Sequence, residues 1–164
     1  MSEQTTEKTK LSRRDFLKLG VGALSALAVL EVSGASLLFL QPRSLDGEFG
    51  GQVIAGLVDS FPPGSVVEFP DGRFYLIHAP DGGFLAVYRR CTHLGCSVSW
   101  EPAQNHFFCP CHASSFDIVG DVENPPAPRA LDTFPVHIDA GQVIVDTSSI
   151  QTRDNFAPDQ LVYA

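Results

Sequence analysis

CTHLGC at residues 91–96 and CPCHASSFD at residues 109–117 are the two stretches that decide how this chain folds. All four cysteines fall in these stretches, within 21 residues, and each stretch combines Cys with His and carries one further Cys. Each stretch adjoins a strand-like run, so we expect each to form a loop at a hairpin end. Two such loops lying side by side can close around a metal centre, because thiolates and imidazoles are both good ligands for transition metals.

The sequence around the two loops has the pattern of a small antiparallel β domain. Short runs rich in β-branched and aromatic residues are divided by turn signals such as Pro70-Asp71-Gly72 and Asp139-Ala140-Gly141. No 15-residue helical pattern follows Leu40. The fold class is therefore predicted to be all-β after this point. The expected strands are residues 65–69, 73–78, 84–88, 97–100, 106–109, 136–139 and 142–145.

Composition and charge limit the partners that the chain can have. Its 164 residues suffice for one domain, and with 44% hydrophobic and 18% charged residues it is not a disordered acidic tail. The net charge of −8 argues against nucleic acid as a partner. The charge is uneven: residues 1–18 hold five basic and three acidic residues, whereas residues 43–164 hold six basic and fifteen acidic ones.

An apolar segment separates the basic N-terminus from the acidic domain. Residues 19–40 carry one charge, Glu31, in 22 positions. As a helix this segment would be about 33 Å long, close to the ~30 Å hydrocarbon core of a bilayer. The basic residues precede it, so we expect a single-pass cell-membrane protein with its N-terminus in the cytoplasm and its domain on the periplasmic or extracytoplasmic side.

The segment Ser12-Arg13-Arg14-Asp15-Phe16-Leu17-Lys18 resembles the twin-arginine export signal S-R-R-x-F-L-K at every specified position. That pathway exports folded proteins, which suits a domain that receives its cofactor in the cytoplasm. A cleaved signal peptide is the alternative, with an apolar core over 17–30 and small residues at 33–35 as the cleavage site. Cleavage would leave the apolar residues 36–40 as a new terminus, so we expect the segment to be retained as an anchor.

These features give a domain organisation. Residues 1–18 are the cytoplasmic signal region, 19–40 the transmembrane anchor, 41–52 a glycine-containing hinge or linker, 53–147 the β domain and 148–164 an extended C-terminal tail. The metal-binding part of the domain is expected over about 89–131.

The two loops resemble the Rieske iron–sulfur signature, C-T-H-L-G-C followed by C-P-C-H-x-S. The resemblance implies an antiparallel β sandwich with a small cluster-binding subdomain that holds one 2Fe–2S cluster. It implies Cys91 and Cys109 as thiolate ligands, His93 and His112 as imidazole ligands, and a disulfide between Cys96 and Cys111. A zinc site is the alternative for a Cys/His set, but it leaves the two further cysteines and the export signal unexplained.

The resemblance also implies residues that tune the cluster. Ser114 matches a serine whose hydroxyl donates to a bridging sulfide, and Leu94 is expected to shield the cluster. Phe116 stands where high-potential members carry a tyrosine that donates to a ligand sulfur, so a lower potential is expected here. Pro126, Ala127 and Pro128 match a proline loop that covers the cluster, whereas Ala113 and Pro125 stand where glycine is usual.

The functional expectation is electron transfer. The anchor, hinge and disulfide resemble the iron–sulfur subunit of a quinol–cytochrome c or quinol–plastocyanin oxidoreductase, with a cytochrome b-type membrane subunit and quinol as partners and a c-type cytochrome as acceptor. One histidine ligand would accept a proton with the electron, and the chain alone is not expected to be catalytic. The alternative is the small Rieske relay subunit of an arsenite oxidase-type molybdenum enzyme.

Overall fold

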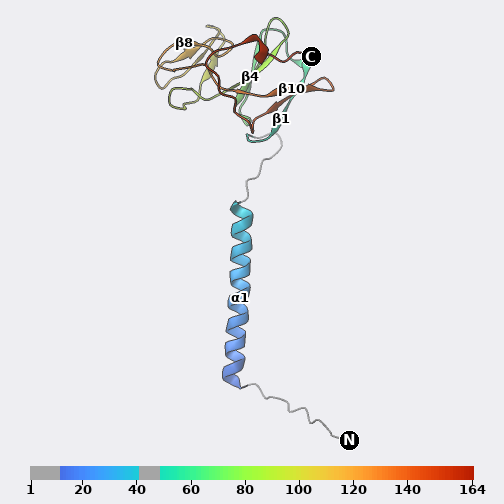
Figure 1. Cartoon of the computed structure of the whole chain (residues 1–164), viewed down its shortest axis with the longest axis vertical. Helices are drawn as coiled ribbons and strands as arrows, with labels where there is room; N and C mark the ends of the chain where they lie inside the picture. The colour runs from blue at the N-terminus through green and yellow to red at the C-terminus, as the bar shows by residue number, and fades with distance from the viewer. Residues whose placement is uncertain (1–11, 41–48) are drawn as a thin grey trace. The chain divides into compact units, whose positions relative to one another are not determined.

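The computed structural model describes residues 12–40 and 49–164. The chain divides between Arg43 and Ser44 into a helical unit and a β unit (Figure 1). Residues 41–48 of the predicted hinge, and residues 1–11 of the predicted signal region, lie outside the described residues.

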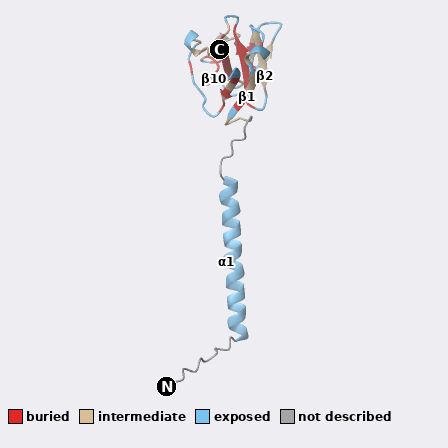
Figure 2. Ribbon diagram, turned by 90° about the vertical axis from the view of Figure 1, so that its right-hand side faces the viewer, coloured by how far each residue is buried: buried red, intermediate tan, exposed pale blue. Residues whose placement is uncertain are grey.

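The helical unit is the single helix α1, Arg13–Leu40. Ser12 caps it, because its Oγ accepts a hydrogen bond from the backbone N–H of Asp15 at 3.2 Å and donates one to the Asp15 carboxylate at 2.6 Å. The 28-residue helix is long and apolar enough to cross a membrane, and the predicted anchor lies within it. None of its side chains is buried, as the pale blue colour of α1 in Figure 2 shows.

The β unit contains eleven strands and two short 3₁₀ helices among the described residues. The strands are β1 (Gln52–Leu57), β2 (Ser65–Phe69), β3 (Phe74–His78), β4 (Phe84–Tyr88), β5 (Ser99–Glu101), β6 (His106–Phe108), β7 (Ser115–Phe116), β8 (Val122–Asn124), β9 (Thr133–Phe134), β10 (Val136–Asp139) and β11 (Gln142–Asp146). The 3₁₀ helices are η1 (Val58–Ser60) and η2 (Pro158–Gln160).

The strands form three sheets, with orders β1-β11-β10, β2-β3-β4-β9 and β5-β6-β7-β8. Every paired strand is antiparallel to its neighbour. The prediction of an antiparallel, all-β unit preceded by one apolar helix is confirmed. The third sheet is the small subdomain that carries the second Cys/His loop.

Strands β3 and β4 are buried on both faces, since all ten of their residues are buried. Successive side chains of a strand point to opposite faces. Leu76 and Ala86 therefore pack into one core with residues of β1 and β11, whereas Ile77 and Val87 pack into a second core with residues of the third sheet. The cysteines Cys91 and Cys109 belong to this second core, so the metal-binding loops rest on the centre of the domain.

The strands that the sequence did not predict are β1, β7, β8 and β9. Strands β7 and β9 have two residues each, too few to show an alternating pattern. Strand β1 buries only Val53 and is interrupted by an irregularity between Ile54 and Gly56. It pairs with β11, whose residues lie 85 to 94 positions further along the chain, and local sequence does not reveal such a pairing.

The C-terminal residues, predicted as an extended tail, run back across the β unit. Gln151 forms a bridge with Thr133, and Val162 forms one with Phe84 of β4. The buried guanidinium of Arg153 donates to the carbonyls of Leu131 and Val119 and to the side chain of Gln160. The segment is thus fixed to the turn before β8 and to the residues before β9.

Arg153 is predicted to stabilise the domain strongly. Changing Arg153→Met leaves two carbonyl groups and one amide oxygen without their donor, and each buried unsatisfied acceptor costs about 1–3 kcal/mol. We expect the free energy of unfolding in urea to fall by about 3 kcal/mol. The neighbouring exposed variant Thr152→Ala should change it by less than about 0.5 kcal/mol. An Arg153→Met domain as stable as the parent would contradict this role.

Candidate metal centre

The first Cys/His loop is closed by two backbone hydrogen bonds. The N–H of Cys91 donates to the carbonyl of Cys96 at 2.8 Å, and the N–H of Gly95 donates to the carbonyl of Cys91 at 2.9 Å. Gly95 has a φ of +81°, a conformation that glycine adopts without steric cost. The loop therefore turns back on itself within six residues and keeps Cys91 in the core.

The second loop repeats this geometry. The N–H of Cys109 donates to the carbonyl of Ser114 at 2.9 Å, and the N–H of Ala113 donates to the carbonyl of Cys109 at 3.0 Å. Ala113 occupies the place of Gly95 and has a φ of +62°. Glycine is favoured at this position because a positive φ is sterically unfavourable for a residue with a Cβ. Each loop presents one buried thiol from the same point of the same turn.

The two loops bring their two free thiols next to each other and their two imidazoles next to each other. Cys91 and Cys109 are unpaired and buried, with their side chains within hydrogen-bonding reach of each other. The rings of His93 and His112 lie with centroids 4.8 Å apart at an angle of 85°. His93 is half-buried and His112 exposed. The thiols therefore lie on the inner side of the site and the imidazoles on its outer side.

Burial raises the pKa of the Cys91 thiol. The backbone N–H of His93 lowers this pKa, the Cys109 thiol raises it, and the Ser114 side chain lowers it by a weaker hydrogen bond. Two adjacent buried thiols are costly to ionise in protein alone, whereas a positively charged metal centre compensates both thiolates. A pair of buried thiols beside two imidazoles fits a 2Fe–2S centre with two sulfur and two nitrogen ligands.

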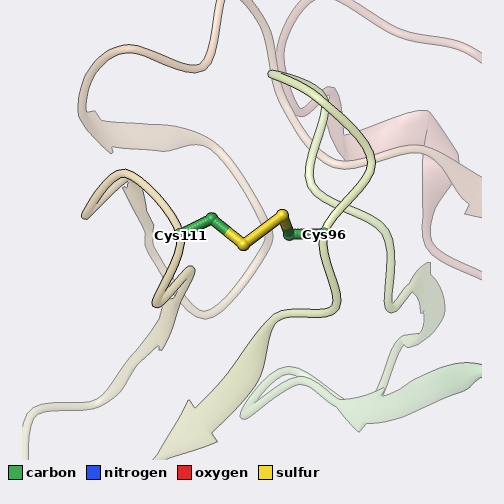
Figure 3. The surroundings of a disulfide bond; sticks show 2 residues. All are labelled: Cys96 and Cys111. Carbon is green, nitrogen blue, oxygen red and sulfur yellow. A yellow bond between two sulfur atoms is a disulfide. The ribbon is translucent and has the colours of Figure 1, made fainter.

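A disulfide between Cys96 and Cys111 ties the two loops together (Figure 3). The Cys109 sulfur lies within 4.8 Å of both of these sulfurs. These three sulfurs are close enough for a metal, but two of them are already bonded to each other, so they do not form a ligand set. The bond instead holds the outer ends of the loops, as the resemblance implied.

A third segment covers the site and is fastened to both loops. The backbone N–H of Ala127 donates to the Ser114 Oγ at 3.0 Å, and the Asn124 amide donates to the carbonyl of Ala113 at 2.8 Å. On the other side, the Thr92 hydroxyl donates to the carbonyl of Arg129 at 2.7 Å. The sequence analysis did not single out Thr92 or Asn124. The position of Thr92 between Cys91 and His93 is a signal that could have indicated its role. The sequence offers no comparable signal for Asn124.

The remaining predicted residues occupy distinct places. Leu94 is 70% exposed at the tip of the first loop, beside a cavity of ≈ 380 Å³ that His93 also lines. Phe116 is fully buried in the core that contains Cys91 and Cys109. Arg13 belongs with Arg14 to the first turn of α1, in the other unit.

His106, the first residue of β6, is half-buried. Its Nε2 lies 3.4 Å from the Glu101 carboxylate and its Nδ1 lies 3.3 Å from that of Glu123. The sequence could not show this arrangement, because Glu123 of β8 comes close to His106 of β6 only when the strands of the third sheet pair.

Comparisons with known proteins identify the family of the domain. The family model of the Rieske [2Fe-2S] domain matches residues 52–135. The cytochrome b6-f complex iron-sulfur subunit of Parasynechococcus marenigrum strain WH8102 is 31% identical over 150 residues, which cover 82% of this chain and 84% of that protein. The corresponding subunit of Chlorobaculum tepidum is 26% identical over 145 residues, which cover 87% of this chain and 80% of that protein.

Two solved structures are similar as well. The plasma membrane Rieske protein PetC3 of Synechocystis PCC 6803 is 33% identical, with a TM-score of 0.42, over 49% of this chain and 83% of that chain. A chain of a hyperthermophilic respiratory complex III is 27% identical, with a TM-score of 0.49, over 77% of this chain and 98% of that chain.

The disulfide is predicted to stabilise the loops and to protect the metal centre. Closing a loop of about 15 residues is worth about 3 kcal/mol in the unfolded-state entropy model. We expect the double variant Cys96→Ala/Cys111→Ala to lose about that much free energy of unfolding in urea. It should also lose its visible metal-centre absorbance faster in the presence of a chelator. The exposed variant Ser97→Ala is the control. A double variant as stable and as slow to bleach as this control would contradict the prediction.

Proposed function

Because this chain belongs to the Rieske [2Fe-2S] family, whose cofactor is one 2Fe–2S cluster, we propose that it is the electron-carrying subunit of a membrane-bound quinol–cytochrome c or quinol–plastocyanin oxidoreductase. One observation carries the proposal. The β unit, residues 44–164, is 121 of 164 residues, or about 74% of the chain. The similarity to a cytochrome b6-f iron-sulfur subunit covers 82%, so it has to reach into the helical unit.

The proposed ligands are Cys91 and Cys109 for one iron and His93 and His112 for the other. The buried thiol pair and the two adjoining imidazoles support this assignment. With neutral imidazoles in place of two thiolates, such a cluster exchanges one electron at about −150 to +300 mV, rather than at about −400 mV. The buried thiols keep water from the sulfur side, while the imidazoles bring the outer side to the protein surface.

The outer imidazole edges are where quinol would meet the chain. In this proposal a ring nitrogen of His93 or His112 receives the hydrogen bond, and then the proton, of the quinol hydroxyl. His112 is the more exposed of the two rings and Leu94 supplies an exposed apolar contact next to them. A cytochrome b-type subunit would complete the quinol pocket, and a c-type cytochrome or an equivalent protein would accept the electron.

The proposed location follows from the helical unit. Helix α1 would anchor the chain in the cell membrane, with the Arg13-Arg14 pair of the export signal on the cytoplasmic side and the β unit on the extracytoplasmic side. The Cys96–Cys111 disulfide supports this orientation, because disulfides persist in oxidising compartments. The segment 41–52 would then serve as the hinge that lets the β unit move between quinol and acceptor.

A second candidate is the small relay subunit of an arsenite oxidase-type molybdenum enzyme. Phe116 in place of a tyrosine and Ala113 in place of a glycine favour it, since both depart from the pattern of high-potential quinol-oxidising members. In that assembly the domain would be docked rigidly and would pass electrons without contact with quinol.

The side chain at residue 116 is predicted to limit the reduction potential. Changing Phe116→Tyr adds a hydroxyl donor in the core that holds both thiols, and donors to cluster sulfur favour the reduced state. A bond stronger by about 1 kcal/mol in the reduced state raises a one-electron potential by roughly 40 mV. A redox titration followed by EPR measures the shift. Phe108→Tyr, on the same sheet, is the control.

If the Phe116→Tyr variant keeps its cluster and its potential does not rise above that of the Phe108→Tyr control, the tuning role is wrong. Loss of the cluster would be visible as loss of the EPR signal and would not be counted as a shift.

The quinol role is tested on native membranes. We expect an EPR-monitored titration to show a Rieske signal whose shape changes when a quinol-pocket inhibitor is added, because the inhibitor occupies the place of quinol next to a histidine ligand. A signal that ignores the inhibitor favours the relay subunit. Membranes from iron-replete cells without any such signal would exclude both candidates.

A further inference from the structure

Three of the five arginines in the described part of the β unit line a single cavity. This arginine pocket has a volume of ≈ 490 Å³ and is lined by Pro70, Arg73, Tyr88, Arg89, Arg90, Gly95 and Ser97. No carboxylate lines it, although residues 43–164 contain fifteen acidic residues against six basic ones. The domain as a whole is acidic, so a concave surface whose only charged lining residues are arginines is unusual in it. Such a surface favours the binding of a negatively charged ligand.

The three arginines are not equivalent. Arg89 is neutralised by Glu68, with the two charged groups 2.5 Å apart, and it donates to the Ser97 hydroxyl at 3.2 Å. Within residues 12–40 and 49–164, no carboxylate lies within 4.0 Å of the guanidinium of Arg73 or Arg90. The pocket therefore carries a net charge of about +2, which comes from the guanidinium groups of Arg73 and Arg90. Arg73 lies just before β3, and Arg90 lies just after β4.

Both unneutralised guanidiniums are held by contacts that leave their charge uncompensated. Arg73 stacks over the Phe49 ring, with its guanidinium carbon 4.7 Å from the ring centroid. Arg90 lies against the first Cys/His loop, so closely that a Cβ on Gly95 would come within 2.9 Å of its Nε. Positioning two arginines in advance lowers the entropy that binding would otherwise cost.

The backbone at Arg73 supports the same interpretation. Arg73 has a φ of +57°, a conformation that costs a non-glycine residue about 1 kcal/mol or more. Its N–H donates to the carbonyl of Pro70, and its carbonyl accepts from the N–H of Arg89. The turn between β2 and β3 thus uses an arginine where a glycine or asparagine would be less strained, and this arginine projects into the pocket.

We propose that the arginine pocket is a binding site for a phosphate-type oxyanion, held by Arg73 and Arg90 with the Ser97 hydroxyl as a further donor. Two guanidinium forks match the oxygens of a phosphate group, and each can form a bidentate contact. Phosphate groups reach such a site either as the free ion or as the headgroup of an anionic phospholipid. The pocket fits both sources because it recognises the shared phosphate.

The site is coupled to the cluster through its position. Arg90 directly precedes Cys91, and its bridge partner Ser97 directly follows Cys96, so the pocket adjoins the first Cys/His loop. A bound anion next to this loop disfavours the added electron and lowers the reduction potential. By reciprocity, the reduced chain must bind the anion more weakly by the factor that corresponds to the shift.

The test uses the full-length, cluster-loaded chain in dodecyl maltoside and a phosphate-free buffer at constant ionic strength. Inorganic phosphate and soluble dibutyryl phosphatidylglycerol are titrated separately by calorimetry. We expect saturable binding of at least one of them, weakened at least tenfold by Arg73→Gln and by Arg90→Gln. Arg129→Gln, an arginine outside this pocket that is paired with Asp132, should change binding less than twofold. The anion should also lower the midpoint potential of the parent but not that of Arg73→Gln.

Binding of phosphatidylglycerol alone would identify a lipid headgroup, and binding of inorganic phosphate alone would identify the free ion; either result supports the site. No saturable binding of either probe would overturn it. Equal weakening by Arg129→Gln would also overturn it, since that would show a general effect of charge. If Arg90→Gln loses its cluster, Arg73→Gln still decides the question, because Arg73 lies in a turn remote in sequence from the cysteines.

Discussion

The buried thiols of Cys91 and Cys109 have to face each other from two separate loops, and much of the β unit is arranged to meet this requirement. Each loop closes through the same two backbone hydrogen bonds, so each thiol emerges from an equivalent position. A disulfide joins the outer ends of the loops, and the segment that contains Ala127 covers them through Ser114. A site fixed at so many points can change its oxidation state with little movement of its ligands, which favours rapid electron transfer.

The support for this site is the sheet that contains β3 and β4. Because both faces of these strands are buried, the same strands form one side of the metal-binding core and one side of the core with β1 and β11. The other core, which contains Leu76 and Ala86 and lies between this sheet and β1-β11-β10, contains none of the cysteines. The two functions of the domain, holding a cluster and maintaining a stable fold, are thus divided between the two cores, which share one sheet.

The sequence revealed the parts of this arrangement that rest on local patterns. Strands β2, β4 and β10 have the predicted limits, and the Cys/His spacing indicated both loops. Features that depend on distant pairing were missed. Strand β1 pairs with β11, His106 meets Glu123 across the third sheet, and Arg153 is buried only because the C-terminal residues cross the domain. No local signal reports such contacts, because each partner alone looks like an ordinary surface residue.

The environment of the cluster combines opposing influences on its reduction potential. The excess of acidic residues in the β unit and the missing hydroxyl at Phe116 both disfavour an added electron. The arginine pocket acts in the other direction, since Arg90 directly precedes a proposed ligand in the sequence and has no carboxylate partner among the described residues, whereas Arg129 is paired with Asp132. The basic residue next to Cys91 in the sequence is therefore also one whose charge an anion could neutralise. In such an arrangement the potential is set by the fold only in part, and the remainder depends on what occupies the pocket.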